Sequence, residues 1–174
     1  LASGGHAFGY DFLDRLTFYD SVTMSYDGAG NRVSKTSGGV TTKYLIDDLT
    51  PTGYAQVAEE VVGGSVVRRY THGTVRSSQT QSIGGTWTTH WYGYDSGLTV
   101  RSLSDSAGAV SDTYVYEGFG GLIRVTGITP NLYLYRGEQF DSDLGAYYLR
   151  ARWYRPISGR FATGDSFEGF ETRP

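Results

Sequence analysis

The sequence predicts an all-β protein made of successive antiparallel hairpins. The first observation is composition: 25 of the 174 residues are Gly and 15 are Tyr, against 4 Pro. Aromatic, Val and Thr residues suit strands, whereas Gly suits turns that need a positive φ. The second observation is that glycine pairs recur between segments of strand-like composition. One short segment aside, no helical period persists for three turns, so a helical bundle or coiled coil is excluded.

Three glycine pairs are predicted to form two-residue hairpin turns, because Gly adopts the positive φ that such turns require. The flanking segments have the length and composition of strands. The predicted hairpins join residues 31–36 to 40–45 across Gly38-Gly39, 55–61 to 65–70 across Gly63-Gly64, and 77–82 to 86–92 across Gly84-Gly85.

One segment admits a second interpretation. Tyr54, Val57, Ala58 and Val61 fall at helical spacing and could form a short amphipathic helix. The adjoining glycine pair and the β-branched residues at 66–67 favour a strand instead.

A tyrosine followed by an acid recurs along the chain, at Tyr10-Asp11, Tyr26-Asp27, Tyr94-Asp95 and Tyr116-Glu117. Such a unit needs stacked neighbours to bury its face. We expect Tyr to end a strand with its ring packed and its hydroxyl in water. The acid would then accept hydrogen bonds from the amides of the following turn, with Gly supplying the positive φ.

These units resemble the YD repeats of the RHS family, which includes bacterial polymorphic toxins, toxin-complex C components and teneurins. Residues 135–165 resemble the RHS-associated core, which follows the repeats. The matching segments are 26–36, with the sequence YDGAGNRVSKT, 92–127, and 135–165, which begins YRGEQFDSDLG. Almost the whole chain is covered.

The resemblance implies a sheet that spirals into a hollow shell, closed by a core that plugs one end. Residues 1–130 would form the YD-repeat sheet segment and 131–174 the core cap. The partners implied are the rest of the parent shell and a C-terminal cargo, commonly a toxin, in a secreted or cell-surface protein. We expect a piece of a longer protein that is not an enzyme by itself and that can self-associate through exposed sheet edges.

In bacterial members the core is also an aspartic autoprotease. Arg152 matches the arginine near the scissile site, and Asp165 matches the first catalytic aspartate, although Ser166 replaces the usual Pro. The second aspartate belongs to a later segment beyond Pro174. Two carboxylates are needed, because one acts as base towards water while the other acts as acid. The site is therefore expected to be incomplete and inactive in this chain.

The same residues have a structural interpretation. Arg152 and Asp165 could form an ion pair or a turn cap. A strand through this segment would place Arg150 and Arg152 on one face, beside Tyr148 and Tyr154, where the arginine stems stack on aromatic rings.

Other classes of function are excluded or weakly supported. A net charge of −3 and a pI near 5.5 argue against nucleic-acid binding. No apolar run is long enough for a membrane helix, and the absence of Cys removes disulfides and thiol nucleophiles. No cofactor or metal is expected. The three histidines, His6, His72 and His90, lack the spacing of zinc ligands. Residues 28–33 lack the third Gly of a dinucleotide fingerprint, and residues 63–67 do not complete the Gly-x-Ser-x-Gly pattern of a nucleophile elbow.

The alternative function is an extracellular adhesion module that binds glycans or a protein through aromatic sheet faces. In the strand predicted over 86–92, Trp87, Thr89 and Trp91 share one face by period two. Such aromatic rows are more often the packed face of a sheet.

Overall fold

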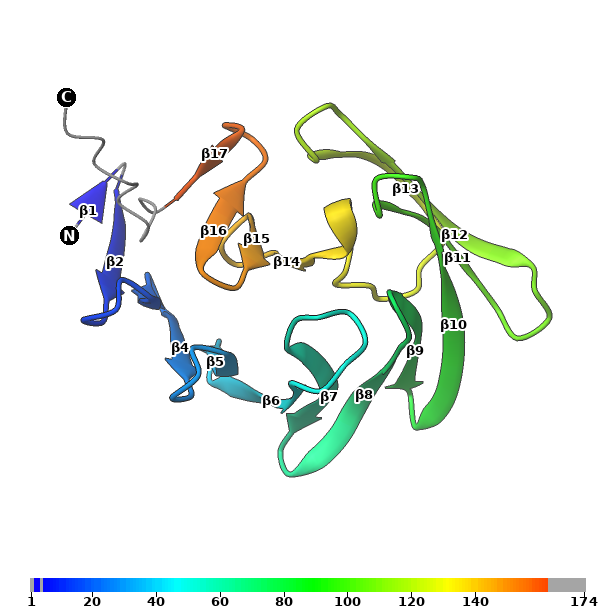
Figure 1. Cartoon of the computed structure of the whole chain (residues 1–174), viewed down its shortest axis with the longest axis horizontal. Helices are drawn as coiled ribbons and strands as arrows, with labels where there is room; N and C mark the ends of the chain where they lie inside the picture. The colour runs from blue at the N-terminus through cyan, green and yellow to red at the C-terminus, as the bar shows by residue number, and fades with distance from the viewer. Residues whose placement is uncertain (1, 4, 163–174) are drawn as a thin grey trace.

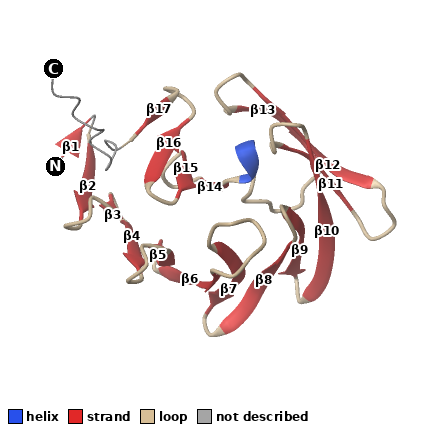
Figure 2. Ribbon diagram, in the orientation of Figure 1, coloured by secondary structure: helices blue, strands red, loops and turns tan. Residues whose placement is uncertain are grey.

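The computed structural model describes residues 2–3 and 5–162, and the predicted all-β class is confirmed. In this part of the chain, thirteen strands form one antiparallel sheet in sequence order and four form a second sheet (Figures 1 and 2). The large sheet contains β1 (Ala2–Ser3), β2 (His6–Tyr10), β3 (Leu16–Tyr19), β4 (Val22–Tyr26), β5 (Arg32–Ser37), β6 (Val40–Asp47), β7 (Gln56–Val62), β8 (Ser65–His72), β9 (Arg76–Ile83), β10 (Thr86–Tyr94), β11 (Val100–Ser104), β12 (Val110–Tyr116) and β13 (Leu122–Thr126). The small sheet contains β14 (Gln139–Asp141), β15 (Ala146–Leu149), β16 (Arg152–Arg155) and β17 (Arg160–Phe161), and follows the 3-10 turn η1 (Tyr135–Gly137).

The large sheet curves into an open arc, and the small sheet lies inside this arc, with β16 and β17 in the opening between its two ends (Figure 1). We call β1–β13 the wall, and η1 together with β14–β17 the plug. Each wall strand pairs with its neighbour in sequence, so the curvature arises from a continuous meander of hairpins whose strands twist.

The three glycine-pair hairpins are confirmed. All six glycines have positive φ, between 56° and 84°, which suits a two-residue hairpin turn. Direct strand partners such as Ser37 and Val40 flank the first of these turns. Residues 56–62 form strand β7 and not the alternative helix, because the adjacent hairpin commits the segment to pairing with β6 and β8.

Two hydrophobic clusters join the wall to the plug. In the first, β3 and β4 pack against the plug side chains Leu144, Ala146 and Trp153. In the second, Val100 and Leu103 pack against the plug side chain Tyr147, with Leu134 beside it. The core is therefore shared between the two sheets and belongs to neither alone.

The outer face of β10 carries the predicted aromatic row. Trp87 and Trp91 are 44% and 41% exposed, while Tyr92 points to the concave side and packs with the second cluster. The period-two prediction for this strand is confirmed, and Trp87 packs under the guanidinium of Arg69.

The expectation that Arg150 and Arg152 share one strand face is wrong. Arg150 lies between β15 and β16 with a φ of 60°, so it belongs to a tight turn. The two side chains consequently stack on different rings, Arg150 on Tyr54 and Arg152 on Phe161. Stacking on aromatic rings was predicted, but the rings are not the ones expected.

Candidate functional site

Five wall turns share one geometry, in which an acid at the first position accepts hydrogen bonds from the backbone amides two and four residues later. In the turn after β4, Oδ1 of Asp27 accepts from the amides of Ala29 at 2.9 Å and Asn31 at 2.8 Å. The predicted role of the acid is therefore confirmed. The five acids are Asp11, Asp27, Asp95, Asp105 and Glu117.

Glycine supplies the positive φ in three of these five turns. Gly30, Gly108 and Gly120 supply it in three turns, but Asp14 (57°) and Leu98 (61°) adopt it in the other two. The turn at Asp105 follows Ser104 and not Tyr, so a search for tyrosine-acid pairs misses it. The pattern of an acid followed by Gly three residues later does identify this turn.

The expectation that the repeat tyrosines keep their hydroxyls in water is wrong for three of the four, Tyr26, Tyr94 and Tyr116. Tyr26 and Tyr94 each donate a 2.7 Å hydrogen bond from the hydroxyl to a backbone carbonyl, of Leu16 and Arg76 respectively. The Tyr116 hydroxyl is buried and has no hydrogen-bond partner among the residues that the structure describes. Burial raises the pKa of Tyr94 to about 12. These rings face the plug, so the repeat supplies the polar and aromatic lining of the hollow.

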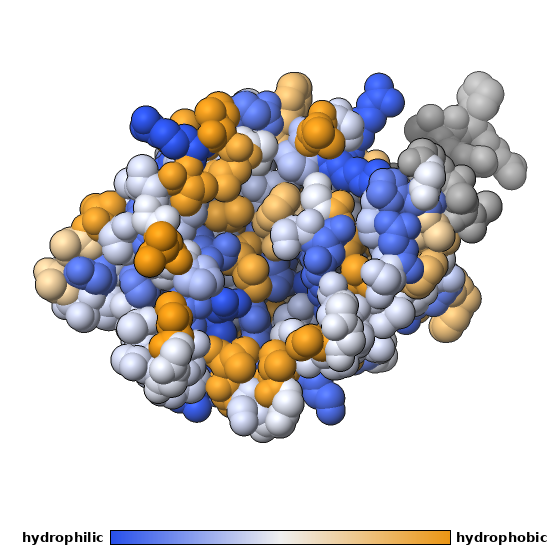
Figure 3. Space-filling view, turned by 180° about the vertical axis from the view of Figure 1, so that it is seen from behind, coloured by the Kyte–Doolittle hydropathy of each residue, from blue (hydrophilic) through white to orange (hydrophobic). Residues whose placement is uncertain are grey.

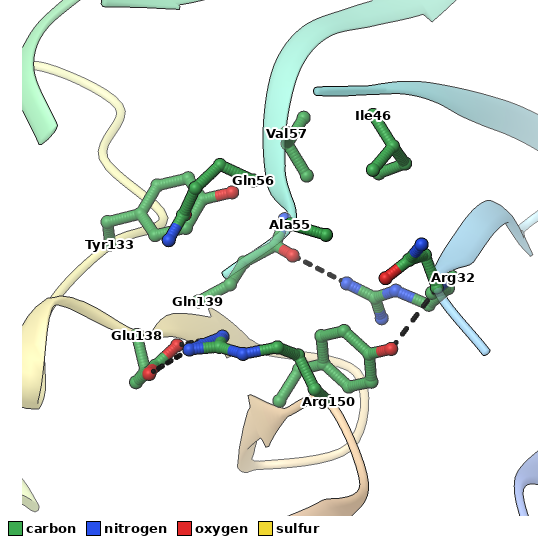
Figure 4. A pocket seen from close by; sticks show the side chains of 11 residues that line it. Arg32, Ile46, Ala55, Gln56, Val57, Tyr133, Glu138, Gln139 and Arg150 are labelled. Atoms are coloured by element: carbon green, nitrogen blue, oxygen red, sulfur yellow. Dashed lines mark hydrogen bonds and ion pairs between the residues drawn. The ribbon is translucent and has the colours of Figure 1, made fainter. Parts of the chain in front are cut away.

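A buried arginine of the wall is held by the plug. Arg32 on β5 is 3% exposed. Its guanidinium donates to Gln139 at 2.6 Å (Figure 4) and lies 3.4 Å from Asp141. The guanidinium also lies over the ring of Tyr148, 4.4 Å from its centroid. Lys35 pairs with Asp141 and, at 2.6 Å, with Asp143, so two cations face two carboxylates. A charge this deeply buried is tolerated because it is both paired and hydrogen-bonded.

A second arginine, Arg76 on β9, holds the loop between the wall and η1. Its guanidinium lies 3.1 Å from the ring centroid of Tyr133 and donates to Gln56 and to the carbonyl of Gly137, both at 3.0 Å. Neither arginine was predicted from the sequence. Arg32 follows a repeat turn, whereas Arg76 has no sequence signal.

A half-buried ion pair lies beside these arginines. Arg150 donates two hydrogen bonds to the carboxylate of Glu138, at 2.8 and 3.0 Å (Figure 4). Burial raises the pKa of Glu138, and the neighbouring Arg150 and Arg76 oppose that shift. The space between these groups has a volume near 30 Å³, about that of one water molecule. This arrangement can clamp the plug to the wall.

Of the two residues that the resemblance assigns to catalysis, Arg152 lies at the start of β16, its guanidinium 3.8 Å from the ring centroid of Phe161. Asp165 lies outside the described residues. Within residues 2–3 and 5–162, no three His, Asp or Glu side chains gather as metal ligands. In the same part of the chain, no helix has the length and apolar character needed to cross a membrane.

Comparison with known proteins gives relatives that are much longer than this chain. The tRNA3(Ser)-specific nuclease WapA of Bacillus spizizenii is 31% identical, and the tRNA nuclease WapA of Bacillus subtilis 30%; each match covers 97% of this chain and 7% of the relative. The structure of the Photorhabdus luminescens Tc holotoxin pore, which contains TccC3, matches with a TM-score of 0.64 at 15% identity, over 91% of this chain and 9% of that one. No family model matches.

The expectation that this chain is not an enzyme is contradicted by the relatives, because the WapA proteins are named as tRNA nucleases. At 15% identity, the similarity to the toxin-complex structure shows a shared fold and nothing about activity. Together, the sequence and fold similarities support a relationship to the RHS-containing toxins. They do not test the assignment of individual YD repeats.

Proposed function

We propose that this chain is the wall-and-plug end of a shell in a longer RHS-type toxin, where it encloses or presents a C-terminal cargo. The observation that carries the proposal is the buried contact between wall and plug, in which Arg32 binds Gln139 and Asp141 across the hollow. A plug held in this way closes the hollow of the wall. Residues 1–130 would act as the wall domain and 131–174 as the core cap.

The partners of this module would be the rest of the shell and the cargo polypeptide, and the whole protein would be secreted or displayed at the cell surface. An apolar groove of about 710 Å³ lies between β13 and the plug, lined by Phe119, Leu122, Phe140 and Ile157 among others. Ile123 on β13 and Ile157 are exposed. Hydrophobic residues gather on the β13 side in the view from behind (Figure 3). A face of this kind favours burial against further protein, and in isolation favours self-association.

Limited proteolysis of the parent protein, with its downstream sequence, tests the enclosure. The downstream sequence is expected to resist protease while the shell is intact and to be cut rapidly in Trp153→Ala, because Trp153 packs the plug onto the wall. Phe12→Ala is the matched control, since Phe12 is exposed. Equal digestion rates for the downstream sequence in the native and the urea-unfolded parent would overturn the proposal.

We further propose that Arg152 and Asp165 contribute to an aspartic autoprotease completed by a second carboxylate in the downstream sequence. One carboxylate would take a proton from the attacking water while the other donates one to the scissile group. Expression with the native downstream sequence, followed by mass spectrometry, is expected to give two products. Asp165→Asn should abolish the cleavage and Arg152→Gln should slow it, while Arg160→Gln, at an exposed position, should leave it unchanged. An uncut wild-type protein would refute this assignment.

A second candidate function, binding of glycans or proteins, rests on the exposed aromatic row of β10. Trp87 and Trp91 are exposed on the same face of β10, with Thr89 between them, and Arg69 lies over Trp87. Sugar rings stack on such exposed aromatic faces. A glycan array comparing the wild type with Trp87→Ala/Trp91→Ala distinguishes this function from enclosure: signal lost in the variant supports it, and absence of any signal removes it.

A further inference from the structure

A polar pocket of about 160 Å³ opens where three wall segments meet the plug. Its lining comes from the loop before β7 and the start of β7, the turn before β9 and the start of β9, the end of β10 and the turn after it, η1 with the residue that follows it, and the turn between β15 and β16. The volume corresponds to about five water molecules, which suits a small ion. The side chains that matter here are Tyr54, Gln56, Arg76, Arg136, Glu138 and Arg150.

The pocket carries an excess of positive charge. Three of its lining residues are arginines and one is a glutamate. The nearby acids are already paired: Glu138 with Arg150 at 2.8 Å, and Asp95 with Arg101 at 2.9 Å. The formal charge of the lining is therefore about +2, contributed by Arg76 and Arg136.

These two arginines bond only neutral atoms among the residues that the structure describes. Arg76 donates to Gln56 and to the carbonyl of Gly137, and its Nε is buried without an acceptor. Arg136 donates to the carbonyl of Gly97 at 3.2 Å. Arg76 is 6% exposed, so its charge is largely withdrawn from water, and the nearby carboxylate of Glu138 is already paired with Arg150. A buried cation in this state is costly unless an anion accompanies it.

The backbone at Arg136 is strained. Its φ of 56° and ψ of 20° lie in the left-handed region, which is unfavourable for a side chain with a Cβ. Gly adopts this conformation without that cost, because it has no Cβ. Backbone strain of this kind is concentrated at active sites and ligand-binding sites. At Arg136 the strained backbone directs the guanidinium to the rim of the pocket. Arg76 and Arg136 come from the wall and the plug respectively, so one ligand can bridge both.

We propose that this pocket binds a doubly charged oxyanion of the phosphate type. Guanidinium groups bind phosphate oxygens in bidentate geometry, and a phosphate dianion matches the charge of Arg76 and Arg136. The bound ion supplies an acceptor charge beside Arg76 and ties η1 to the wall turns. This site goes beyond the enclosure role, and its existence is independent of whether the chain closes a shell.

Nuclear magnetic resonance titration of the chain tests the site directly, because Arg76 and Arg136 report through their Nε–H signals. Inorganic phosphate at pH 8 and sulfate, at constant ionic strength, are expected to shift both signals in a saturable manner. Acetate should bind at least about tenfold more weakly, because it carries one charge. Acetate binding as tightly as phosphate would overturn the dianion assignment, and the absence of saturable shifts would overturn the site.

Arg136→Gly is the decisive variant, because it removes the cation and relieves the strained φ, so it is expected to fold. It should weaken phosphate binding at least about tenfold, measured by the Arg76 signal. Arg124→Gln is the matched control: it removes one exposed positive charge from β13, outside the pocket lining, and should bind phosphate as the wild type does. Equal affinity in Arg136→Gly and Arg124→Gln would refute the proposal.

Discussion

The wall and the plug are both antiparallel sheets, yet different interactions hold them in place. Wall turns are completed locally: the carboxylate of Asp27 is satisfied by amides two and four residues away. The plug is positioned by contacts across the fold, such as Arg32 with Asp141, which are 109 positions apart in the sequence. The wall is therefore a set of repeated local units, whereas the plug depends on the wall for its position. A substitution at the contact between them should cost more than one in a wall turn.

Trp153→Ala should give the largest loss of stability. Trp153 is 3% exposed and packs the plug onto β3 and β4. Removing such a side chain costs about 3–5 kcal/mol, because a cavity remains. Urea unfolding followed by circular dichroism measures the loss. Phe12→Ala, at a 91% exposed position, should change the free energy of unfolding by less than ~0.5 kcal/mol. Equal losses in the two variants would contradict a core shared between the sheets.

Gly120→Ala should rank next, and Gly30→Ala isolates the reason. Both glycines occupy the same place in equivalent turns, with φ of 88° and 87°. A Cβ at Gly120 would lie 2.5 Å from the ring of Tyr135 in the plug, whereas a Cβ at Gly30 would meet nothing within 4 Å. Gly30→Ala should cost ~1–2 kcal/mol from the backbone alone, and Gly120→Ala ~1–3 kcal/mol more from the clash.

The comparison of these two variants is made by thermal and urea unfolding under the same conditions. If Gly120→Ala costs no more than Gly30→Ala, then Tyr135 does not press on the wall turn as the structure describes.

Asp27→Ala should have a smaller effect, because it removes acceptors within one wall turn. The loss should be ~1 kcal/mol, as for the loss of a helix cap that bonds backbone amides in the same way. Asp27→Asn keeps an acceptor oxygen and should recover most of the stability in urea unfolding. An Asn variant as unstable as the Ala variant would show that the charge, and not the acceptor, supports the turn.

The last effect expected is a pH dependence from His72 in the wall. Burial, followed by the nearby Arg76, lowers the pKa of His72 to about 4, while Asp47 opposes the shift. As the pH falls, the unfolded chain therefore binds a proton at His72 near pH 6.5, whereas the folded chain binds one only near pH 4. This contribution to stability is fully present above pH 6.5 and is lost as the pH falls towards 4.

Melting temperatures at pH 7.5 and pH 5.0 measure this contribution. His72→Gln should show a smaller fall between the two pH values than the wild type does. An identical fall in both proteins would assign the acid sensitivity to other groups.

The sequence by itself determined the parts of this protein that depend on neighbouring residues. The glycine-pair hairpins, the strand at 56–62, the faces of β10 and the acid-centred turns all follow from preferences that act over about five residues. The resemblance to the RHS family added an expected order of sheet and plug. The turn at Asp105 lies inside the segment 92–127 that resembles the repeat, although no Tyr precedes its acid.

Only the tertiary structure decided what occupies the hollow of the wall. It turned the hydroxyls of Tyr26 and Tyr94 inward, set Arg32 against Gln139 and Asp141, and gave Arg136 a left-handed backbone. Contacts between residues a hundred positions apart have no characteristic spacing along the chain, so periodicity cannot reveal them. The curvature of the wall brings these residues together, and that curvature is the sum of thirteen strands and not the property of any one.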